Sequence, residues 1–253
     1  MDWSRAKSVL ILAFLILNII LGYQLWLDVR EQLSSNLDWT SLPEDTKKQM
    51  EMKLIQVQGK IPSETPALIE RTFQFVDEEQ DTKRVDLPAP VSSQLIFNEK
   101  ELRKALKDEV PMIERYVFDP ATSPPTSPDG VFRLQYMLDN KWPMFEVSLE
   151  LFYANQNIVA YRENKVIELE SKEKADKEQK VLPATNALGI LIEKFLPTGS
   201  VVKEIKLGYH GQIYNETLVT APAWRIVLES GDIYFVNAIS AEVYHPKGEQ
   251  QKE

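Results

Sequence analysis

The pattern of hydrophobic and polar positions divides the chain near residue 27. Residues 9–27, VLILAFLILNIILGYQLWL, are an uncharged run of nineteen residues. At 1.5 Å per helical residue this run is about 28 Å long, close to the thickness of the hydrocarbon core of a bilayer. We therefore predict a transmembrane helix that anchors the chain in the lipid bilayer. Two alternatives fit less well, because a cleaved signal peptide has a shorter apolar core and a buried core helix has a polar face.

The charges beside this run predict its orientation. Arg5 and Lys7 precede it, and Asp28 follows it closely. Positive charge stays on the cytoplasmic side of a membrane. We expect residues 1–8 to be a cytoplasmic tail, residues 28–42 to be a juxtamembrane linker, and the remainder to lie outside the cell membrane as the ectodomain of a single-pass protein.

Beyond the linker, apolar residues recur with helical spacing in three places. This spacing predicts one helix from Pro43 towards Val57, one that follows the N-cap Asn98, and one over residues 185–196. The apolar residues expected on the buried sides of the first two helices are Met50, Leu54 and Val57, and Leu102, Ala105, Leu106 and Val110.

Alternating apolar positions rich in β-branched and aromatic residues predict strands between and after these helices. The predicted strands cover residues 68–76, 131–138, 145–153, 158–163, 201–209, 218–219, 224–228, 233–237 and 243–244. Pro88 and Pro90 confine any strand near them to a sheet edge. Residues 119–130 are dense in Pro, Ser and Thr and are expected to be an exposed loop, and residues 170–180 a solvated charged run.

Two short segments of the chain resemble each other. Residues 143–150, PMFEVSLE, and residues 222–229, PAWRIVLE, both have the pattern Pro-x-aromatic-x-branched-x-Leu-Glu. Each follows a helix and a strand and precedes a hairpin, so the pattern predicts a duplicated helix-plus-antiparallel-sheet unit, although two short matches also arise by chance.

The predicted fold class is therefore α+β, with an N-terminal transmembrane helix followed by two similar units. The expected divisions after the linker are residues 43–95 as an N-terminal helix and strand segment, 96–168 as the first unit, 169–181 as a charged connector, 182–246 as the second unit and 247–253 as a disordered tail.

Composition and charge exclude several function classes. The net charge of −9 and the pI near 5.0 argue against a nucleic-acid partner, which requires a basic surface. The chain has no cysteine, which excludes disulfides and a thiol nucleophile, so the ectodomain depends on its hydrophobic core.

The sequence offers few candidates for catalysis. The two histidines are His210, expected at a strand end or turn, and His245, near the C-terminal tail. No third metal ligand is signalled, and no nucleophile motif or glycine-rich phosphate loop occurs. We predict no catalytic, cofactor-binding or metal-binding residue, and we expect no enzyme activity.

The predicted span contains one candidate partner-binding face. Asn18 and Gly22 are four residues apart and share one side of a helix, and Tyr23 lies near them. A buried amide seeks a hydrogen-bond partner on another helix, so this face is predicted to pair with a neighbouring span. The alternative, a tolerated polar residue in a monomeric span, stays open.

The N-terminal sequence MDWSRAKSVLILAFLILNIILGYQLW and the C-terminal YFVNAISAEVY resemble the YycI (WalI) family. This resemblance implies an accessory regulator of the WalK/WalR (YycG/YycF) two-component system in Gram-positive bacteria. Such a protein associates with the WalK/YycG-type sensor histidine kinase, together with a companion YycH-type protein, and so modulates cell-wall metabolism. Residues 223–244 also resemble small PepSY-type sheet modules of exported proteins.

Two further functions remain as alternatives to the kinase regulator. A PepSY-like module that binds a peptide or ligand and restrains a protease is one, because an exposed sheet edge accepts an extended peptide by strand addition. A cell-wall hydrolase is the other, and the missing catalytic motifs disfavour it.

Overall fold

The computed structural model describes Phe14, Asn18 and Leu21 and residues 42–76, 83–122, 130–169 and 178–245. The rest of the predicted span, the tail 1–8, residues 28–41 and the tail 247–253 lie outside the described residues. Within the described part, no helix has both the length and the apolar character needed to cross a bilayer.

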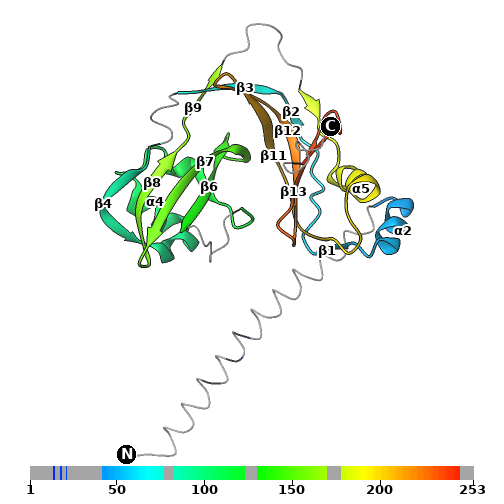
Figure 1. Cartoon of the computed structure of the whole chain (residues 1–253), viewed down its shortest axis with the longest axis horizontal. Helices are drawn as coiled ribbons and strands as arrows, with labels where there is room; N and C mark the ends of the chain where they lie inside the picture. Colours follow the sequence, from blue (N-terminus) through cyan, green and yellow to red (C-terminus); the bar gives the residue numbers. More distant parts are fainter. Residues whose placement is uncertain are drawn as a thin grey trace, which may run out of the picture.

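The described chain has an α+β fold that is mostly sheet (Figure 1). Its helices between residues 42 and 245 are α2 (Glu44–Met52), α4 (Glu99–Leu106), α5 (Ala184–Lys194) and the 3-10 helices η2 (Ser93–Phe97) and η3 (Ile113–Arg115). Its strands are β1 (Gln56–Val57), β2 (Ala67–Leu68), β3 (Arg71–Phe75), β4 (Val85–Ser92), β5 (Tyr116–Phe118), β6 (Val131–Leu138), β7 (Trp142–Ala154), β8 (Asn157–Glu163), β9 (Val166–Leu169), β10 (Gln179–Lys180), β11 (Val201–Tyr214), β12 (Thr217–Leu228), β13 (Ile233–Asn237) and β14 (Val243–Tyr244).

A single twelve-stranded sheet runs through the molecule in the order β14-β13-β12-β11-β7-β6-β5. Strands β1, β3, β4, β8 and β9 branch from this path, and β2 pairs separately with β10. Most pairs are antiparallel, but β1 and β7 each pair parallel to β11. Because β7 and β11 share only one register pair, Met144 with Tyr209, the sheet is divided there into two lobes.

The first lobe, which we call the α4 lobe, comprises residues 83–163. Its helix α4 begins at the predicted N-cap, where the Asn98 side chain accepts a hydrogen bond from the Glu101 N–H at 3.4 Å. Leu102 and Leu106 are buried as predicted, whereas Ala105 is exposed. The core of this lobe contains, besides these two leucines, Val110, Ile113, Leu134, Leu149, Leu151 and Ile158. Among the described strands β4 pairs only with β8, and its register shifts across the two prolines, as expected of an edge strand.

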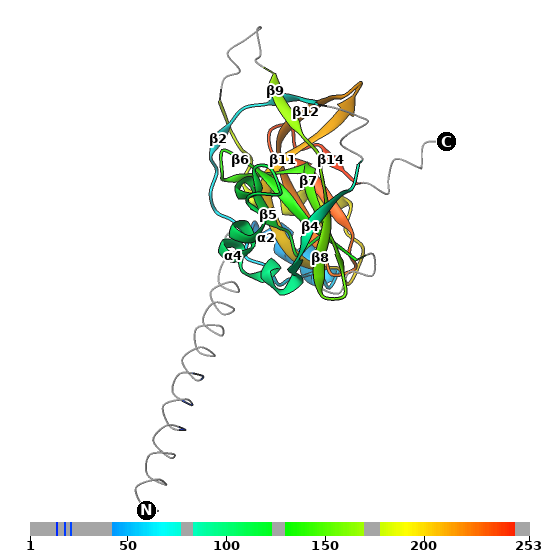
Figure 2. The ribbon, with the colours of Figure 1, turned by 90° about the vertical axis from the view of Figure 1, so that its left-hand side faces the viewer.

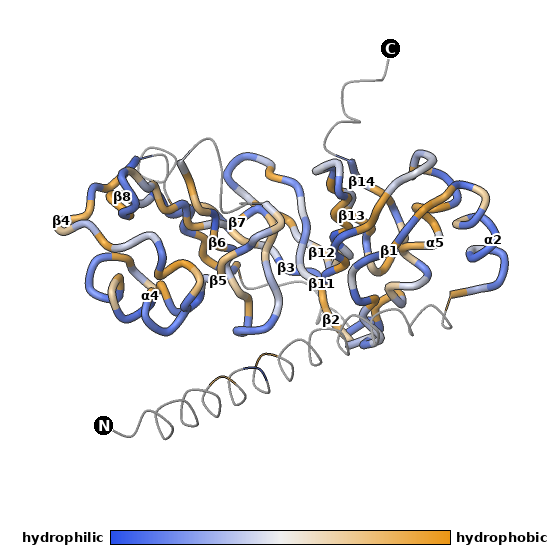
Figure 3. Tube along the Cα trace, turned by 90° about the horizontal axis from the view of Figure 1, so that it is seen from below, coloured by the Kyte–Doolittle hydropathy of each residue, from blue (hydrophilic) through white to orange (hydrophobic). Residues whose placement is uncertain are grey.

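The second lobe, which we call the α5 lobe, comprises residues 42–61 and 178–245. Helix α5 packs on the sheet, and α2 packs on α5, so α2 is the outer layer. Figure 3 shows the corresponding difference in hydropathy, with α2 mostly hydrophilic and the hydrophobic positions of α5 nearer the sheet. The core includes Met50, Val57, Leu188, Leu191, Ile192, Val202, Trp224, Ile226 and Val236.

The predicted helix over residues 43–57 is correct only as far as Met52. Leu54 has a positive φ of 54° and is exposed, and Val57 is buried in strand β1 instead of on a helix. The helix ends because β1 pairs parallel with the edge of β11, and this long-range pairing outweighs local helix propensity.

Strands β11 and β12 are longer than predicted. The predicted strands 218–219 and 224–228 are one strand, β12, which contains Pro222. Pro222 is tolerated because it lies in a gap in the pairing: β3 pairs with β12 up to Thr220, and β13 pairs with it from Ala223. His210, expected at a strand end or turn, lies within β11.

Strand β3 links the lobes at one end of the molecule. It lies between β12 and β9, and these strands are at the opposite end from α2 and α4 (Figure 1 and Figure 2). A third core cluster supports this link, with residues from β3, β6, β7, β11 and β12: Phe73, Leu138, Met144, Val147, Tyr209 and Leu218. The two lobes are therefore held by shared apolar packing as well as by the sheet.

Candidate functional site

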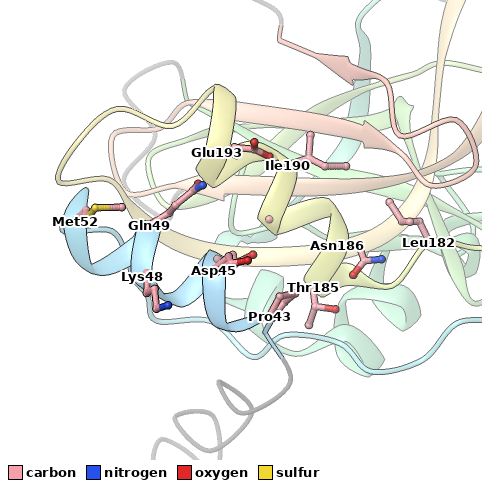
Figure 4. Close-up of a pocket in the computed structure, with 12 residues that line it drawn as sticks. Pro43, Asp45, Lys48, Gln49, Met52, Leu182, Thr185, Asn186, Ile190 and Glu193 are labelled. Carbon is pink, nitrogen blue, oxygen red and sulfur yellow. The ribbon is translucent and has the colours of Figure 1, made fainter.

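An open groove lies between helices α2 and α5 of the α5 lobe (Figure 4). Its volume is about 710 Å³. The groove is lined by Pro43, Asp45, Thr46, Lys48, Gln49, Met52, Leu182, Thr185, Asn186, Gly189, Ile190 and Glu193. Its floor and walls come from segments more than 120 residues apart in the chain.

Two contacts set the spacing of the helices that form the groove. Gly189 of α5 faces Thr46 of α2, where a methyl group added at Gly189 would lie 3.4 Å from Thr46 Oγ1, an ordinary van der Waals contact. At the other end, Lys53 Nζ donates to the carbonyls of Ile192 at 2.6 Å and Glu193 at 3.1 Å. A cation at the carboxyl end of α5 satisfies carbonyls that lack partners within the helix and complements the helix dipole.

The chemistry of the groove suits binding. Its charged side chains, Asp45, Lys48 and Glu193, are exposed, and Met52 is 74% exposed beside them. The groove has hydroxyl groups but no histidine to activate them as nucleophiles. The groove therefore offers apolar, amide and charged groups to a binding partner.

A buried ion pair joins the two lobes on the face of the sheet away from α5. Arg225 of β12 donates two hydrogen bonds to Asp119, which follows β5, at 2.6 and 3.0 Å, and a third to Glu204 at 3.0 Å. The guanidinium also lies over the ring of Phe145, 4.9 Å from its centre. The side chains of Arg225 and Asp119 are 1% and 2% exposed. The predicted exposed loop over residues 119–130 is therefore wrong at Asp119, and residues 123–129 lie outside the described residues.

Burial and the positive charge of Arg225 shift the pKa of Asp119 in opposite directions. Burial alone would raise the pKa of this carboxyl, but the hydrogen bonds and the positive charge of Arg225, with help from Thr122, lower the pKa below its usual value. Burial acts to lower the pKa of Arg225, and Asp119 and Glu204 together raise it above its usual value. Both groups are thus charged at neutral pH, and each neutralises the other.

The two histidines occupy separate places in the α5 lobe. His210 Nδ1 contacts the Glu146 carboxylate of the α4 lobe, and its ring stacks on Phe235 with centroids 3.9 Å apart. His245 lies against the ring of Tyr234. Among the described residues no group of three His, Cys, Asp or Glu side chains is arranged to hold a metal ion. The His210 contact therefore fits a junction between lobes.

The predicted face of the span is only partly described. Asn18 is helical and exposed, as are Phe14 and Leu21, whereas Gly22 and Tyr23 lie outside the described residues. Whether the three predicted residues come together thus stays a prediction. Sequence reasoning missed both the groove and the Asp119–Arg225 pair. The only sequence signal for the pair is Arg225, a charged residue in the otherwise apolar segment AWRIVL.

Comparisons with known proteins give one strong match. A family model described as YycI protein matches residues 46–239. No curated protein is similar to the chain. Among solved structures, the C-terminal domain of YpeB from Bacillus megaterium is 17% identical with a TM-score of 0.36, over 68% of this chain and 71% of that one. An uncharacterized protein from Eubacterium rectale is 13% identical with a TM-score of 0.37, over 70% of this chain and 67% of that one. These values describe a distant likeness, from which nothing about function follows.

Proposed function

The chain belongs to the YycI family, and on this premise we propose that it is a membrane-anchored, extracytoplasmic regulator of a WalK (YycG)-type sensor histidine kinase. The single observation that carries the proposal is the family match over residues 46–239, which spans both lobes. In this role the protein binds the kinase, together with a companion YycH-type protein, and changes the balance between its signalling states. It does so by binding those states with different affinities. Control of cell-wall metabolism is the expected outcome.

We place the ectodomain contact in the groove between α2 and α5. Pro43, at the start of α2, lines the groove, and only residues 28–42 separate α2 from the predicted span. Fifteen extended residues reach at most about 50 Å, so the groove stays within that distance of the membrane surface. A kinase domain held in the same membrane would meet this part of the chain.

We place the membrane contact on the predicted face of Asn18, Gly22 and Tyr23. The Asn18 amide has no water to bond with in a bilayer core, so a polar group on a neighbouring span is its natural partner. One or two kcal/mol per such bond makes this contact a modest contribution that supplements the ectodomain contact.

We also propose that the two lobes descend from one duplicated helix-and-sheet unit. In each lobe a helix precedes a strand, a two-residue turn with positive φ at both positions, and a middle strand that contains the repeated octapeptide up to its Leu, although η3 and β5 intervene after the helix of the α4 lobe. The turns are Asp139-Asn140 and Asn215-Glu216, and the middle strands are β7 and β12. This common order supports the duplication.

Co-purification with the kinase tests the proposed function. The full-length chain is isolated from membranes as the wild type, as Asn18→Leu, and as the double variant Asp45→Lys with Glu193→Lys. We expect Asn18→Leu to weaken retention of the kinase about tenfold, because one interhelical hydrogen bond is lost. We expect the double variant to weaken it as well, because two groove acids change sign.

A matched variant controls for the change in net charge. Glu101→Lys with Asp108→Lys makes the same change on exposed positions of the α4 lobe, far from the groove. Retention of the kinase by this control should equal that of the wild type. Kinase retention that is unchanged in both test variants, or reduced equally by the control, would show that the proposed contacts are not used.

A further inference from the structure

Independently of the kinase proposal, we propose that strand β9 is a self-association edge. It pairs antiparallel with β9 of a second copy of the chain, about a twofold axis that passes through Ile167. The result is a symmetric dimer in which the sheets of the two copies are continuous. The proposal rests on the direction of the backbone groups of β9, on the side chains of the sheet face beside it, and on its sequence.

The backbone of β9 has an open edge. Among the described residues β9 pairs only with β3. The Val76 N–H donates to the Lys165 carbonyl at 3.1 Å. Since hydrogen-bonded positions alternate along an antiparallel pair, Ile167 and Leu169 also direct their backbone groups towards β3. The N–H and C=O groups of Val166 and Glu168 therefore point away from the sheet, where a further strand would bind them.

The other side of β3 agrees with this alternation. The Phe75 N–H donates to the Glu216 carbonyl at 2.9 Å, towards β12. Odd-numbered residues of β3 thus bond to β12, and even-numbered ones bond to β9. The assignment of outward-pointing groups on β9 follows from two hydrogen bonds on opposite sides of the same strand.

On one face of the sheet beside this edge, two neighbouring rows hold no charged residue, and Lys165, which pairs with Val76, borders them. Residues paired directly across strands share a face, and the registers place two rows of four residues there: Leu169, Thr72, Val219 and Gln212, and Ile167, Gln74, Thr217 and Tyr214. Ile167 is 59% exposed and Val219 is 46% exposed. The opposite face is covered, with Phe73 and Leu218 buried.

An exposed edge of this kind normally carries protection. Soluble proteins shield edge strands with charged side chains, prolines or a covering segment. The one charged residue of β9, Glu168, lies on the covered face and pairs with Arg71 at 3.2 Å. In a chain of which 26% of residues are charged, two uncharged, half-apolar rows beside an edge that no described strand covers indicate a surface that another strand binds.

The sequence of β9 suits a second copy of itself. With the axis at Ile167, Val166 of one copy lies opposite Glu168 of the other, so the outward groups of both residues meet in four hydrogen bonds. Ile167 lies opposite Ile167, and both belong to the uncharged rows. No two like charges face each other, whereas a register centred on Glu168 would place two carboxylates together. The isologous arrangement closes after two copies.

Disulfide cross-linking of the full-length chain tests this arrangement. The chain has no cysteine, so Ile167→Cys introduces one thiol without background. In the proposed dimer the two thiols lie in a non-hydrogen-bonded pair with Cα atoms about 4.5 Å apart, within the range of a disulfide. Leu169→Cys is the matched control on the same strand and face, because its Cα would lie about 13 Å from its counterpart. After oxidation we expect a linked dimer of the first variant only, on a non-reducing gel.

A proline variant distinguishes cross-linking that depends on strand pairing from cross-linking that results from random collision. In the Ile167→Cys background, Glu168→Pro removes the outward N–H from both copies, and Glu168→Ala removes only the side chain and its ion pair. We expect the proline variant to lower the linked fraction about tenfold and the alanine variant to leave it unchanged. Circular dichroism shows whether the proline variant folds; if it does not, the comparison of the two cysteine positions decides.

Four results would overturn the proposal, and the first three concern the variants themselves. They are no linkage at Ile167→Cys, equal linkage at Leu169→Cys, or an equal fall in linkage with Glu168→Pro and Glu168→Ala when both variants fold. Linkage of Ile167→Cys to another protein in place of a second copy would also overturn it. None of these results bears on kinase retention, so this proposal and the proposed function fail separately.

Discussion

At the scale of single residues, the Arg225 side chain has an unusual position for a charge. It lies on a central strand, is 1% exposed, and satisfies its charge with Asp119 from the other lobe and with Glu204 from its own. A buried ion pair adds little to stability compared with apolar residues of similar size, but removal of one partner leaves the other charge unpaired in the interior. The pair therefore makes correct docking of the lobes a condition of folding.

The first prediction concerns this pair. Asp119→Asn should lower the free energy of unfolding by about 3–5 kcal/mol, because Arg225 loses its closest counter-charge within the interior. Asp139→Asn is the control, since Asp139 pairs with Arg71 at 2.8 Å but is 58% exposed. That change should cost less than about 1 kcal/mol. Urea unfolding of the purified chain measures both, and equal losses would contradict the assigned role of Asp119.

The second prediction concerns how the free energy of unfolding depends on pH at Asp119. The pKa of Asp119 is lower in the folded chain than its usual value of about 3.9. At pH values near and below 3.9 the unfolded state binds a proton here that the folded state does not. The stabilisation from this carboxyl is thus fully present above the unfolded pKa and is lost as the pH falls through the folded pKa.

The measurement compares the wild type with Asp119→Asn across pH. We expect the difference in unfolding free energy to stay constant above about pH 5 and to narrow steadily below about pH 4. A difference that stayed constant down to pH 2 would mean that Asp119 does not titrate in this way.

At the scale of elements, the sequence predicts strands whose bounds depend on residues within the strand itself or next to it. The predicted strands 131–138 and 233–237 have the bounds of β6 and β13, because these short runs rich in β-branched and aromatic residues are bounded by turn residues such as Asp139-Asn140 and Ser230-Gly231-Asp232. The predicted helix over residues 53–57 is wrong because residues 56–57 pair as strand β1 with Val201 and Val202, about 145 residues away. Local sequence patterns do not show such a long-range pairing. The groove could not be predicted for the same reason, as its two walls meet only in the folded chain.

Glycine near His210 shows a second limit of local patterns. Gly208 lies within the predicted strand 201–209, and the structure shows that its role there is close packing within β11. A methyl group added there would lie 2.5 Å from the Pro143 carbonyl oxygen and 2.6 Å from the Phe145 ring. The glycine thus lets the two lobes approach each other, and no pattern within residues 201–209 predicts this contact with the other lobe.

The third prediction tests that approach. Gly208→Ala should destabilise the chain by about 1–3 kcal/mol, because the added methyl group overlaps backbone and ring atoms of the other lobe. Gly189→Ala is the control on α5, where the nearest atom to an added methyl is 3.4 Å away. This control should be neutral or stabilising by up to about 1 kcal/mol, since alanine favours a helix more than glycine. Thermal unfolding followed by circular dichroism distinguishes the two, and a neutral Gly208→Ala would contradict the proposed packing.

At the scale of the whole molecule, residues near the start of the described chain pack with residues near its end. The core of the α5 lobe takes Leu42, Met50, Ile55, Val57 and Ile61 from the segment before the α4 lobe and the remainder from residues after it. The α4 lobe is thus inserted between two parts of the α5 lobe. Residues 42–61, which follow the predicted span and linker, are therefore part of this core.

The fourth prediction follows from this arrangement: residues 178–245 alone will not fold. Each of the five buried side chains contributed by residues 42–61 stabilises the lobe by about 1.5–3 kcal/mol, and their sum of roughly 10 kcal/mol equals the whole stability of a typical domain. The isolated fragment should show little near-ultraviolet circular dichroism and no cooperative unfolding. Addition of a synthetic peptide of residues 42–61 should restore both, at least in part, because it supplies the missing apolar surface and β1. A matched peptide with Met50→Asp and Val57→Asp should fail to do so, since it would bury unpaired carboxylates. A cooperative unfolding transition of the fragment without the peptide would show that residues 42–61 are not required for this lobe to fold.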